Sequence, residues 1–117
     1  MADEKLGSAS ALQATLAALA ETIDARAGGD PSQSYTAKLL NKGPRKCAQK
    51  IVEEAGELAI ALAAEGEDNV ASEAADLLYH VLVGLRARGV ALDAVAEKLD
   101  GRAGVSGLSE KASRSSK

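Results

Sequence analysis

The chain has 117 residues, and its 14 basic and 17 acidic side chains give a net charge of −3, which offers no general attraction for nucleic acid. The composition, without Trp or Phe and with the single cysteine Cys47, excludes an aromatic core, a disulfide framework and a cysteine metal site. The length and the abundance of Ala, Leu, Val and Ile predict one all-α domain, in which Cys47 is a small buried packing residue.

Glycine, proline and serine divide the chain into five expected helices. The segment 28–31 ends the first helix, Lys42-Gly43-Pro44 separates the second from the third, and Gly66 and Gly89 end the third and fourth. The expected helices run from Ser8 or Ser10, as the N-cap, to Arg26, from Ser34 to Asn41, from Pro44 to Ala64, from Asp68 to Arg88 and from Leu92 to Leu99.

The folded domain is expected to span residues 8–100, with tails on both sides. Residues 1–7 form an irregular start, and residues 101–117 are rich in Gly, Ser, Lys and Arg, so both segments are expected to be disordered. The sequence begins with no signal-peptide pattern and contains no apolar run of membrane-spanning length. We therefore expect a cytoplasmic protein without a membrane partner.

Two acidic motifs are the most informative feature of the sequence: Glu53-Glu54-Ala55-Gly56-Glu57 and, fifteen residues later, Glu73-Ala74-Ala75-Asp76. Carboxylates three residues apart lie on one face of a helix, and the spacer lets the chain return antiparallel. Close carboxylates repel one another unless a cation lies between them, and an all-oxygen site favours Mg²⁺ or Mn²⁺ over Zn²⁺. The expected metal ligands are Glu54, Glu57, Glu73 and Asp76.

The alternative for these acids is an ordinary solvated helix face, which is the commoner origin of a single pair of glutamates. The segment from Ile51 to Leu85 contains eight acids and no Lys or Arg. An exposed helix usually intersperses lysines that pair with its acids four residues away. The absence of such partners in the sequence favours a metal site.

Apolar side chains on the two acidic helices predict a partner subunit. One side of the third helix is expected to carry Cys47, Ala48, Ile51, Val52, Ala55, Leu58, Ala59 and Leu62. Lys46, Lys50, Glu53 and Glu57 fall on the opposite strip, with Glu54 at the boundary. The fourth helix has a broad apolar side formed by Val70, Ala71, Ala74, Ala75, Leu77, Leu78, Val81, Leu82 and Leu85. One hairpin and a small helix cannot cover this surface, so we expect a homodimer that forms a helical bundle.

Five cations precede the acidic stretch without an acid among them: Lys38, Lys42, Arg45, Lys46 and Lys50. Cations beside a carboxylate-bound metal are typical of a polyphosphate site, in which they neutralise the phosphate oxygens. Lys50 has a second interpretation, because it lies four residues before Glu54 and could pair with it. A nucleic-acid patch has little support, since only Tyr35 is close enough in the sequence to stack on a base.

His80 shares a strip of the fourth helix with Glu73 and Asp76. Three interpretations stay open for it: a partner that holds a carboxylate, a contact to the substrate, or a residue at the edge of the bundle. Neutral histidine is not a preferred ligand of Mg²⁺, so we do not place it among the metal ligands.

The paired motifs resemble the E-x-x-E…E-x-x-D signature of the all-α, MazG-like nucleotide pyrophosphohydrolases. Three further segments narrow the resemblance to the phosphoribosyl-ATP pyrophosphohydrolase family, over roughly Leu12 to Leu99. These segments are Ser34-Tyr35-Thr36-Ala37-Lys38-Leu39, residues 46–54 and Ala75-Asp76-Leu77-Leu78-Tyr79-His80.

The resemblance implies a Mg²⁺-dependent hydrolase of the second step of histidine biosynthesis. Its reaction converts 1-(5-phosphoribosyl)-ATP and water into 1-(5-phosphoribosyl)-AMP and pyrophosphate. By the same resemblance Glu54 and Glu57 are catalytic as metal ligands, and the five cations bind phosphates. Glu53 either orients or deprotonates the water or is a fifth metal ligand. Tyr35, Tyr79 and His80 are expected substrate contacts, and a phosphoribosyl-AMP cyclohydrolase is an expected functional partner that would use the product.

Two other functions stay open on the sequence. A housecleaning enzyme with the same chemistry would hydrolyse noncanonical nucleoside triphosphates and accept simple dNTPs. A non-catalytic helical dimerisation module would carry the same acids as solvated side chains and would bind no metal through them.

Overall fold

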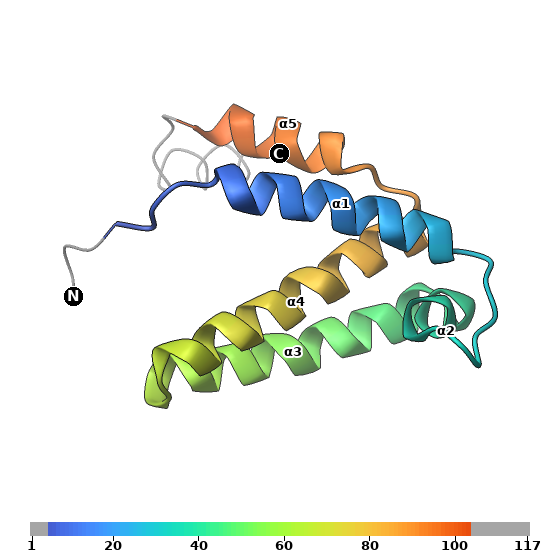
Figure 1. The fold of residues 1–117 in the computed structure, drawn as a ribbon, viewed down its shortest axis with the longest axis horizontal. Helices are drawn as coiled ribbons and strands as arrows, with labels where there is room; N and C mark the ends of the chain where they lie inside the picture. Colours follow the sequence, from blue (N-terminus) through green and yellow to red (C-terminus); the bar gives the residue numbers. More distant parts are fainter. Residues whose placement is uncertain (1–4, 104–117) are drawn as a thin grey trace, which may run out of the picture.

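The computed structural model describes residues 5–103, and these residues form helices and no strands (Figure 1). This confirms the predicted all-α fold. Within the described part of the chain, no helix is both long and apolar enough to cross a membrane. The helices are α1 (Ser10–Arg26), α2 (Tyr35–Lys42), α3 (Pro44–Ala64), α4 (Glu67–Arg88) and α5 (Leu92–Arg102).

Local sequence signals account for most of the helix ends. Ser34 caps α2, because its hydroxyl accepts a hydrogen bond from the Ala37 amide at 3.1 Å. Pro44 opens α3, where its missing amide hydrogen costs nothing. Gly89 ends α4 in the left-handed conformation, with φ of 69°, which glycine adopts without strain. The bounds of α3 match the prediction at both ends, and Pro44 accounts for its start.

Four predicted bounds differ in detail from the structure, and the smallest difference is the start of α4 at Glu67, next to the expected Asp68. The N-cap of α1 is Ala9, and neither Ser8 nor Ser10 caps the helix, although the Ser8 hydroxyl accepts a bond from the Ser10 amide at 3.2 Å. α2 continues through Lys42, one residue past the expected end. α5 continues to Arg102, so it enters the segment that was expected to be disordered. Residues 1–4 and 104–117 of the expected tails lie outside the described residues.

α3 and α4 form an antiparallel hairpin, in which the two long helices lie side by side along their length (Figure 1). A glycine allows close approach where they meet: a Cβ atom at Gly84 would lie 3.1 Å from Cδ1 of Ile51. The hairpin therefore has the arrangement that the fifteen-residue spacer predicted, and it brings the two acidic motifs to facing positions.

The core lies at the α2 end of the hairpin, where four helices meet. Its buried residues are Ile23 from α1, Leu39 from α2, Cys47 from α3, and Leu82 and Val83 from α4. Cys47 is buried, as predicted, and its thiol approaches the carbonyl oxygen of Leu39 at 3.7 Å. On the surface, Arg86 pairs with Asp24 at 2.9 Å and so also ties α4 to α1.

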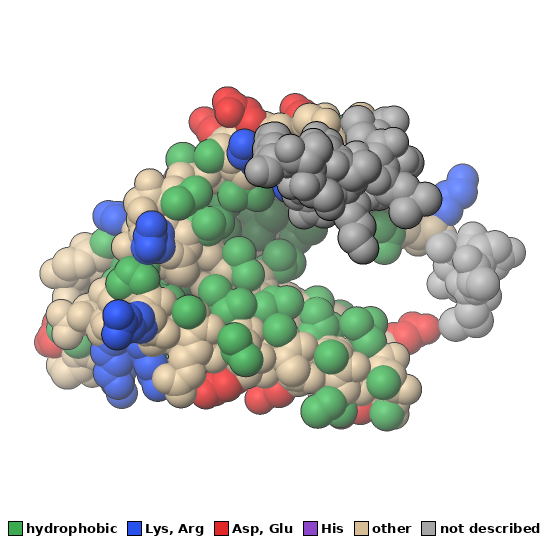
Figure 2. All heavy atoms as spheres, turned by 180° about the vertical axis from the view of Figure 1, so that it is seen from behind, with side chains coloured by type: hydrophobic (Ala, Val, Ile, Leu, Met, Phe, Trp, Pro, Cys, Tyr) green, Lys and Arg blue, Asp and Glu red, His purple; other side chains and the backbone are tan. Residues whose placement is uncertain are grey.

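The predicted apolar side of α3 is only partly covered within one chain. Cys47 is buried, whereas Val52 is 73% exposed and Leu62 is 65% exposed. The buried side of α3 instead includes Ala61 and Glu54, so Glu54 faces inward and does not mark a boundary. Figure 2 shows hydrophobic side chains gathered along the hairpin and in the angle between the hairpin and the opposite arm of the molecule. A broad apolar surface therefore stays open to solvent in the single chain.

Candidate active site

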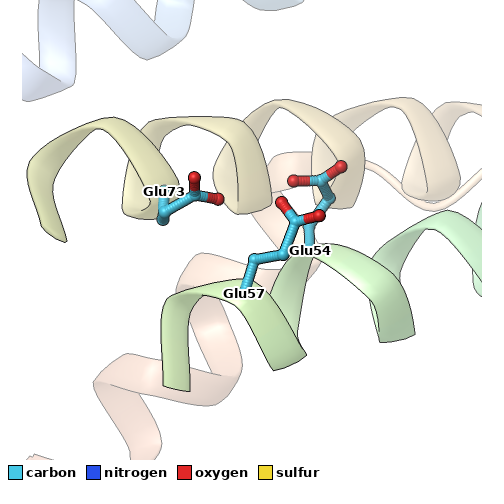
Figure 3. Close-up of side chains that lie close together, drawn as sticks. All are labelled: Glu54, Glu57 and Glu73. Carbon is cyan, nitrogen blue, oxygen red and sulfur yellow. The ribbon is translucent and has the colours of Figure 1, made fainter. Parts of the chain in front are cut away.

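Three of the four predicted metal ligands converge between α3 and α4 (Figure 3). Glu54 and Glu57 project from adjacent turns of α3, and Glu73 extends toward them from α4. One carboxylate oxygen from each of the three residues lies within 4.8 Å of the other two. Glu54 is buried, Glu73 is half-buried and Glu57 is exposed, so the cluster opens to solvent on one side.

Asp76, the fourth predicted ligand, is exposed and does not belong to this close group. It nevertheless lies near it, because its charge raises the pKa of both Glu54 and Glu73. The spacing of three residues places Glu73 and Asp76 on one strip of α4, as expected. Only Glu73 belongs to the close group with Glu54 and Glu57.

The electrostatics of the cluster favour a bound cation. Burial, followed by the neighbouring Glu57 charge, raises the pKa of Glu54 above the ordinary value of a glutamate. Burial also raises the pKa of Glu73, and a hydrogen bond with Glu57 adds to the effect. Within residues 5–103, one buried oxygen of Glu54 and one of Glu73 meet no hydrogen-bond donor. Buried carboxylate oxygens without donors are costly, and a divalent cation would satisfy both of them.

The donor set fits a hard ion, since all three groups offer oxygen. No histidine or cysteine joins the group within the described residues. The cluster could therefore hold a divalent metal ion.

Glu53 lies on the same helix but has different partners. It accepts hydrogen bonds from Lys50 at 2.9 Å and from Gln49 at 3.1 Å. The Lys50 hydrogen bond is the main reason that the pKa of Glu53 is lowered. Lys50 also approaches Glu54 at 3.9 Å. In this structure Lys50 therefore pairs with the acids, as the second interpretation of this residue predicted. Glu53 is accordingly an ionised carboxylate beside the cluster.

An aromatic and polar network joins α2 to α4 beside the acids. His80, which is 7% exposed, has its Nδ1 atom 2.7 Å from the carbonyl oxygen of Asp76. A carbonyl can only accept, so Nδ1 donates to it, and Nε2 lies in hydrogen-bond contact with the Tyr35 hydroxyl at 3.1 Å. The Tyr79 hydroxyl is hydrogen-bonded to the buried Thr36 hydroxyl. The network therefore fixes α2 on the hairpin.

The three predicted substrate contacts thus differ in what they offer to a ligand. The polar atoms of all three have partners within the protein, and Tyr35 differs from the other two because it is 49% exposed and offers part of its ring surface. Its ring stacks on Tyr79, with centroids 6.3 Å apart. Sequence reasoning did not single out Thr36, and the only available signal was its place next to Tyr35 in an otherwise polar helix start.

Basic side chains gather at the α2 end of the molecule (Figure 2). Arg45 is exposed and Lys46 half-buried on the first turn of α3. Lys38 and Lys42 are exposed on α2 and line an open hollow of about 610 Å³. The other residues that line this hollow are Pro31, Ser32, Gln33, Ser34, Tyr35 and Asn41.

A second hollow, of about 430 Å³, lies between α1 and the α4–α5 corner. None of the predicted site residues lines it, and its walls include Ile23, Leu82, Leu85 and Val90. A highly charged ligand requires cations and hydrogen-bond donors, so the hollow on α2 is the better candidate for substrate binding.

Comparison with known proteins shows to which family the chain belongs. Residues 16–103 match the family model of phosphoribosyl-ATP pyrophosphohydrolase. A phosphoribosyl-ATP pyrophosphatase of Caulobacter vibrioides strain NA1000 is 62% identical over 96 residues, which cover 82% of this chain and 89% of that protein. The phosphoribosyl-ATP pyrophosphatase of Rhodobacter capsulatus is 54% identical over 99 residues, which cover 85% of this chain and 96% of the relative. The chain therefore belongs to the phosphoribosyl-ATP pyrophosphohydrolase family.

Proposed function

We propose that this protein hydrolyses 1-(5-phosphoribosyl)-ATP to 1-(5-phosphoribosyl)-AMP and pyrophosphate, the second step of histidine biosynthesis. The observation that carries the proposal is the convergence of Glu54, Glu57 and Glu73 in a chain of this family. A cluster of acids alone is common on helices. Here, among residues 5–103, one buried oxygen of Glu54 and one of Glu73 have no hydrogen-bond donor, and Lys38 and Lys42 line the hollow on α2.

Glu54, Glu57 and Glu73, with Asp76 as the fourth residue, would hold a divalent ion, for which Mg²⁺ is our choice and Mn²⁺ a substitute. When bound, the ion supplies positive charge against the triphosphate and the departing pyrophosphate. Glu54 and Glu73 must be ionised to bind it, which opposes the raised pKa of each group.

Glu53 is suited to orienting the attacking water. Its pKa is lowered by Lys50, so it is a weak base but a good hydrogen-bond acceptor at neutral pH. It lies one residue from Glu54, at the edge of the cluster. We therefore assign it a role in holding the water between α3 and the phosphate, in preference to full proton removal.

The cations would divide the negative charge of the substrate among them. Lys50, which lies beside Glu53 and Glu54, is placed to neutralise the phosphates nearest the acids. Arg45 and Lys46 follow on the first turn of α3.

We also propose that the protein acts as a homodimer, in which α3 and α4 of both subunits form a central bundle. The exposed apolar side chains Val52, Leu62 and Leu78 on these helices support this arrangement, because solvent-exposed apolar surface of this kind is usually covered by a partner. In the product, phosphoribosyl-AMP, the adenine ring still carries the second ribose 5-phosphate. The enzyme that uses this product would be a phosphoribosyl-AMP cyclohydrolase.

Release of pyrophosphate tests the reaction. The purified protein with Mg²⁺ should release pyrophosphate from phosphoribosyl-ATP and much less from ATP or a panel of dNTPs. Comparable turnover of dNTPs would favour the housecleaning enzyme instead. The dimerisation module would show neither turnover nor carboxylate-dependent Mg²⁺ binding in calorimetry, and that result would end the enzymatic proposal.

A further inference from the structure

We propose that the hollow on α2 binds the second ribose 5-phosphate of the substrate, and that Lys38 and Lys42 thereby select phosphoribosyl-ATP over ordinary nucleoside triphosphates. This inference rests on the proposed function and assigns the part of the substrate that the two lysines hold. The substrate differs from ATP by one phosphorylated pentose, so a protein that discriminates between them needs a subsite for hydroxyls and a phosphate.

The walls of the hollow match that chemistry. The side-chain amides of Gln33 and Asn41 line it, and neither forms a hydrogen bond within residues 5–103. The hydroxyl groups of Ser34 and Ser32 lie here too, but the first already caps α2 and the second donates to Asp30 at 2.8 Å. Amide and hydroxyl groups are the usual partners of sugar hydroxyls, and the volume of about 610 Å³ lies within the range of small-molecule sites.

The two lysines match the phosphate. Lys38 and Lys42 are four residues apart on α2, so their side chains occupy adjacent turns of one helix face. Across the described ranges, no ion pair involves either of them, in contrast to Lys50, which pairs with Glu53 and Glu54. Two uncompensated cations on one face are available to a doubly charged phosphate.

Tyr35 connects the hollow to the acidic cluster. Its side chain lines the hollow, and its hydroxyl bonds to His80 on α4, one turn after Asp76. Burial is the main reason that the pKa of Tyr35 is raised above its ordinary value. The nearby charge of Lys50 lowers this pKa, and that of Glu54 raises it. One ligand can therefore pass over the half-exposed ring of Tyr35, with its triphosphate at the acids and its second ribose in the hollow.

The competing assignment gives Lys38 and Lys42 to the triphosphate. The two assignments differ in which ligands feel the loss of a lysine. The reaction product phosphoribosyl-AMP and its parent AMP share every group except the second ribose 5-phosphate. The ratio of their inhibition constants, measured against phosphoribosyl-ATP hydrolysis, therefore reports on the proposed subsite alone.

In the wild type, phosphoribosyl-AMP should inhibit more strongly than AMP. Lys38→Ala or Lys42→Ala should reduce that preference by about ten- to a hundred-fold, since a hydrogen bond to a charged group is lost. Inhibition by AMP and by pyrophosphate should not change. Lys50→Ala should weaken pyrophosphate inhibition without altering the preference, and Lys98→Ala, on the exposed surface of α5, serves as the matched control with no effect.

An unchanged preference in both Lys38→Ala and Lys42→Ala would overturn the inference, as would equal inhibition by the two ligands in the wild type. Weaker inhibition by AMP or pyrophosphate in these variants would assign the lysines to the ATP part and would also overturn it. In each of these cases wild-type turnover of phosphoribosyl-ATP leaves the proposed function intact. A wild type that releases no pyrophosphate from phosphoribosyl-ATP would instead refute the proposed function, and the inference would fail with it.

Discussion

The exposed apolar side of α3 allows a quantitative prediction for the proposed dimer. Val52 lies on this side with Leu62 and is 73% exposed in the single chain. Glu54 and Ala61 occupy the opposite, buried side. If a second subunit covers the exposed side, truncation of Val52 should weaken the association without disturbing the packing of α3 on α4.

The size of the effect follows from the exposed fraction. Val52→Ala removes two methyl groups, and each buried group of this size is worth about 0.8 kcal/mol. Scaling by the exposed 73% gives about 1.2 kcal/mol per subunit, and the two symmetric copies together give about 2.3 kcal/mol. The dissociation constant of the dimer should therefore rise about fifty-fold. Val52→Asp adds the penalty of desolvating an unpaired carboxylate, which is several kcal/mol, and should give a monomer at micromolar concentration.

Sedimentation equilibrium across the nanomolar to micromolar range measures these constants, and circular dichroism checks that the helices persist. Leu99→Asp is the matched control, because Leu99 is 63% exposed on α5, away from the proposed interface, and its substitution should leave the dissociation constant unchanged. A Val52→Asp protein that dimerises as tightly as the wild type would refute the reasoning. A wild type that is monomeric at micromolar concentration would do the same.

Two further predictions concern the acidic cluster and the core. Glu57→Ala or Asp76→Ala should abolish both turnover and the rise in melting temperature that Mg²⁺ produces. The metal-free variant should be as stable as the wild type or more stable, because a repelling charge is removed. Near-full turnover of either variant at saturating Mg²⁺ would contradict the metal site. Burial raises the pKa of the Cys47 thiol, so the folded state keeps a proton that the unfolded chain loses near pH 8.5. Its contribution to stability is complete below that pH and declines as the pH rises toward the folded pKa, a decline that Cys47→Ala should lack. A thiol reagent at pH 8 should accordingly label Cys47 only as the protein unfolds, and rapid labelling of the native protein would show that the thiol is accessible.

Local sequence signals were sufficient for the helices and for the pairing of the acidic motifs. Pro44, Ser34 and Gly89 act on their own turns of backbone, so their effects do not depend on distant contacts. The first helix shows the limit of such signals, because two neighbouring serines competed for the cap and the structure uses Ala9. The family resemblance followed from the same short motifs, and the match of residues 16–103 to the family model confirms it.

The rotation of each helix about its axis was decided only by tertiary packing. A period of 3.6 residues groups side chains into faces but does not say which face meets a neighbour, particularly when apolar side chains cover more than half of a helix. Gly84 lets Ile51 approach closely, and α3 is accordingly turned so that Glu54 points inward while Val52 points out. The same rotation brings Glu73 into the acidic group and leaves Asp76 at its edge.

By itself, the sequence determined the helices, their order and the family, because these depend on residues within a few positions of one another. The tertiary structure alone decided the hydrogen-bond partners of Tyr35, Tyr79 and His80, and it formed the hollow on α2, which Tyr35 also lines. The Tyr35 hydroxyl and its His80 partner are separated by 45 residues. Contacts over such a separation depend on how α2 crosses the hairpin, and that crossing results from the combined packing of four helices rather than from any local pattern.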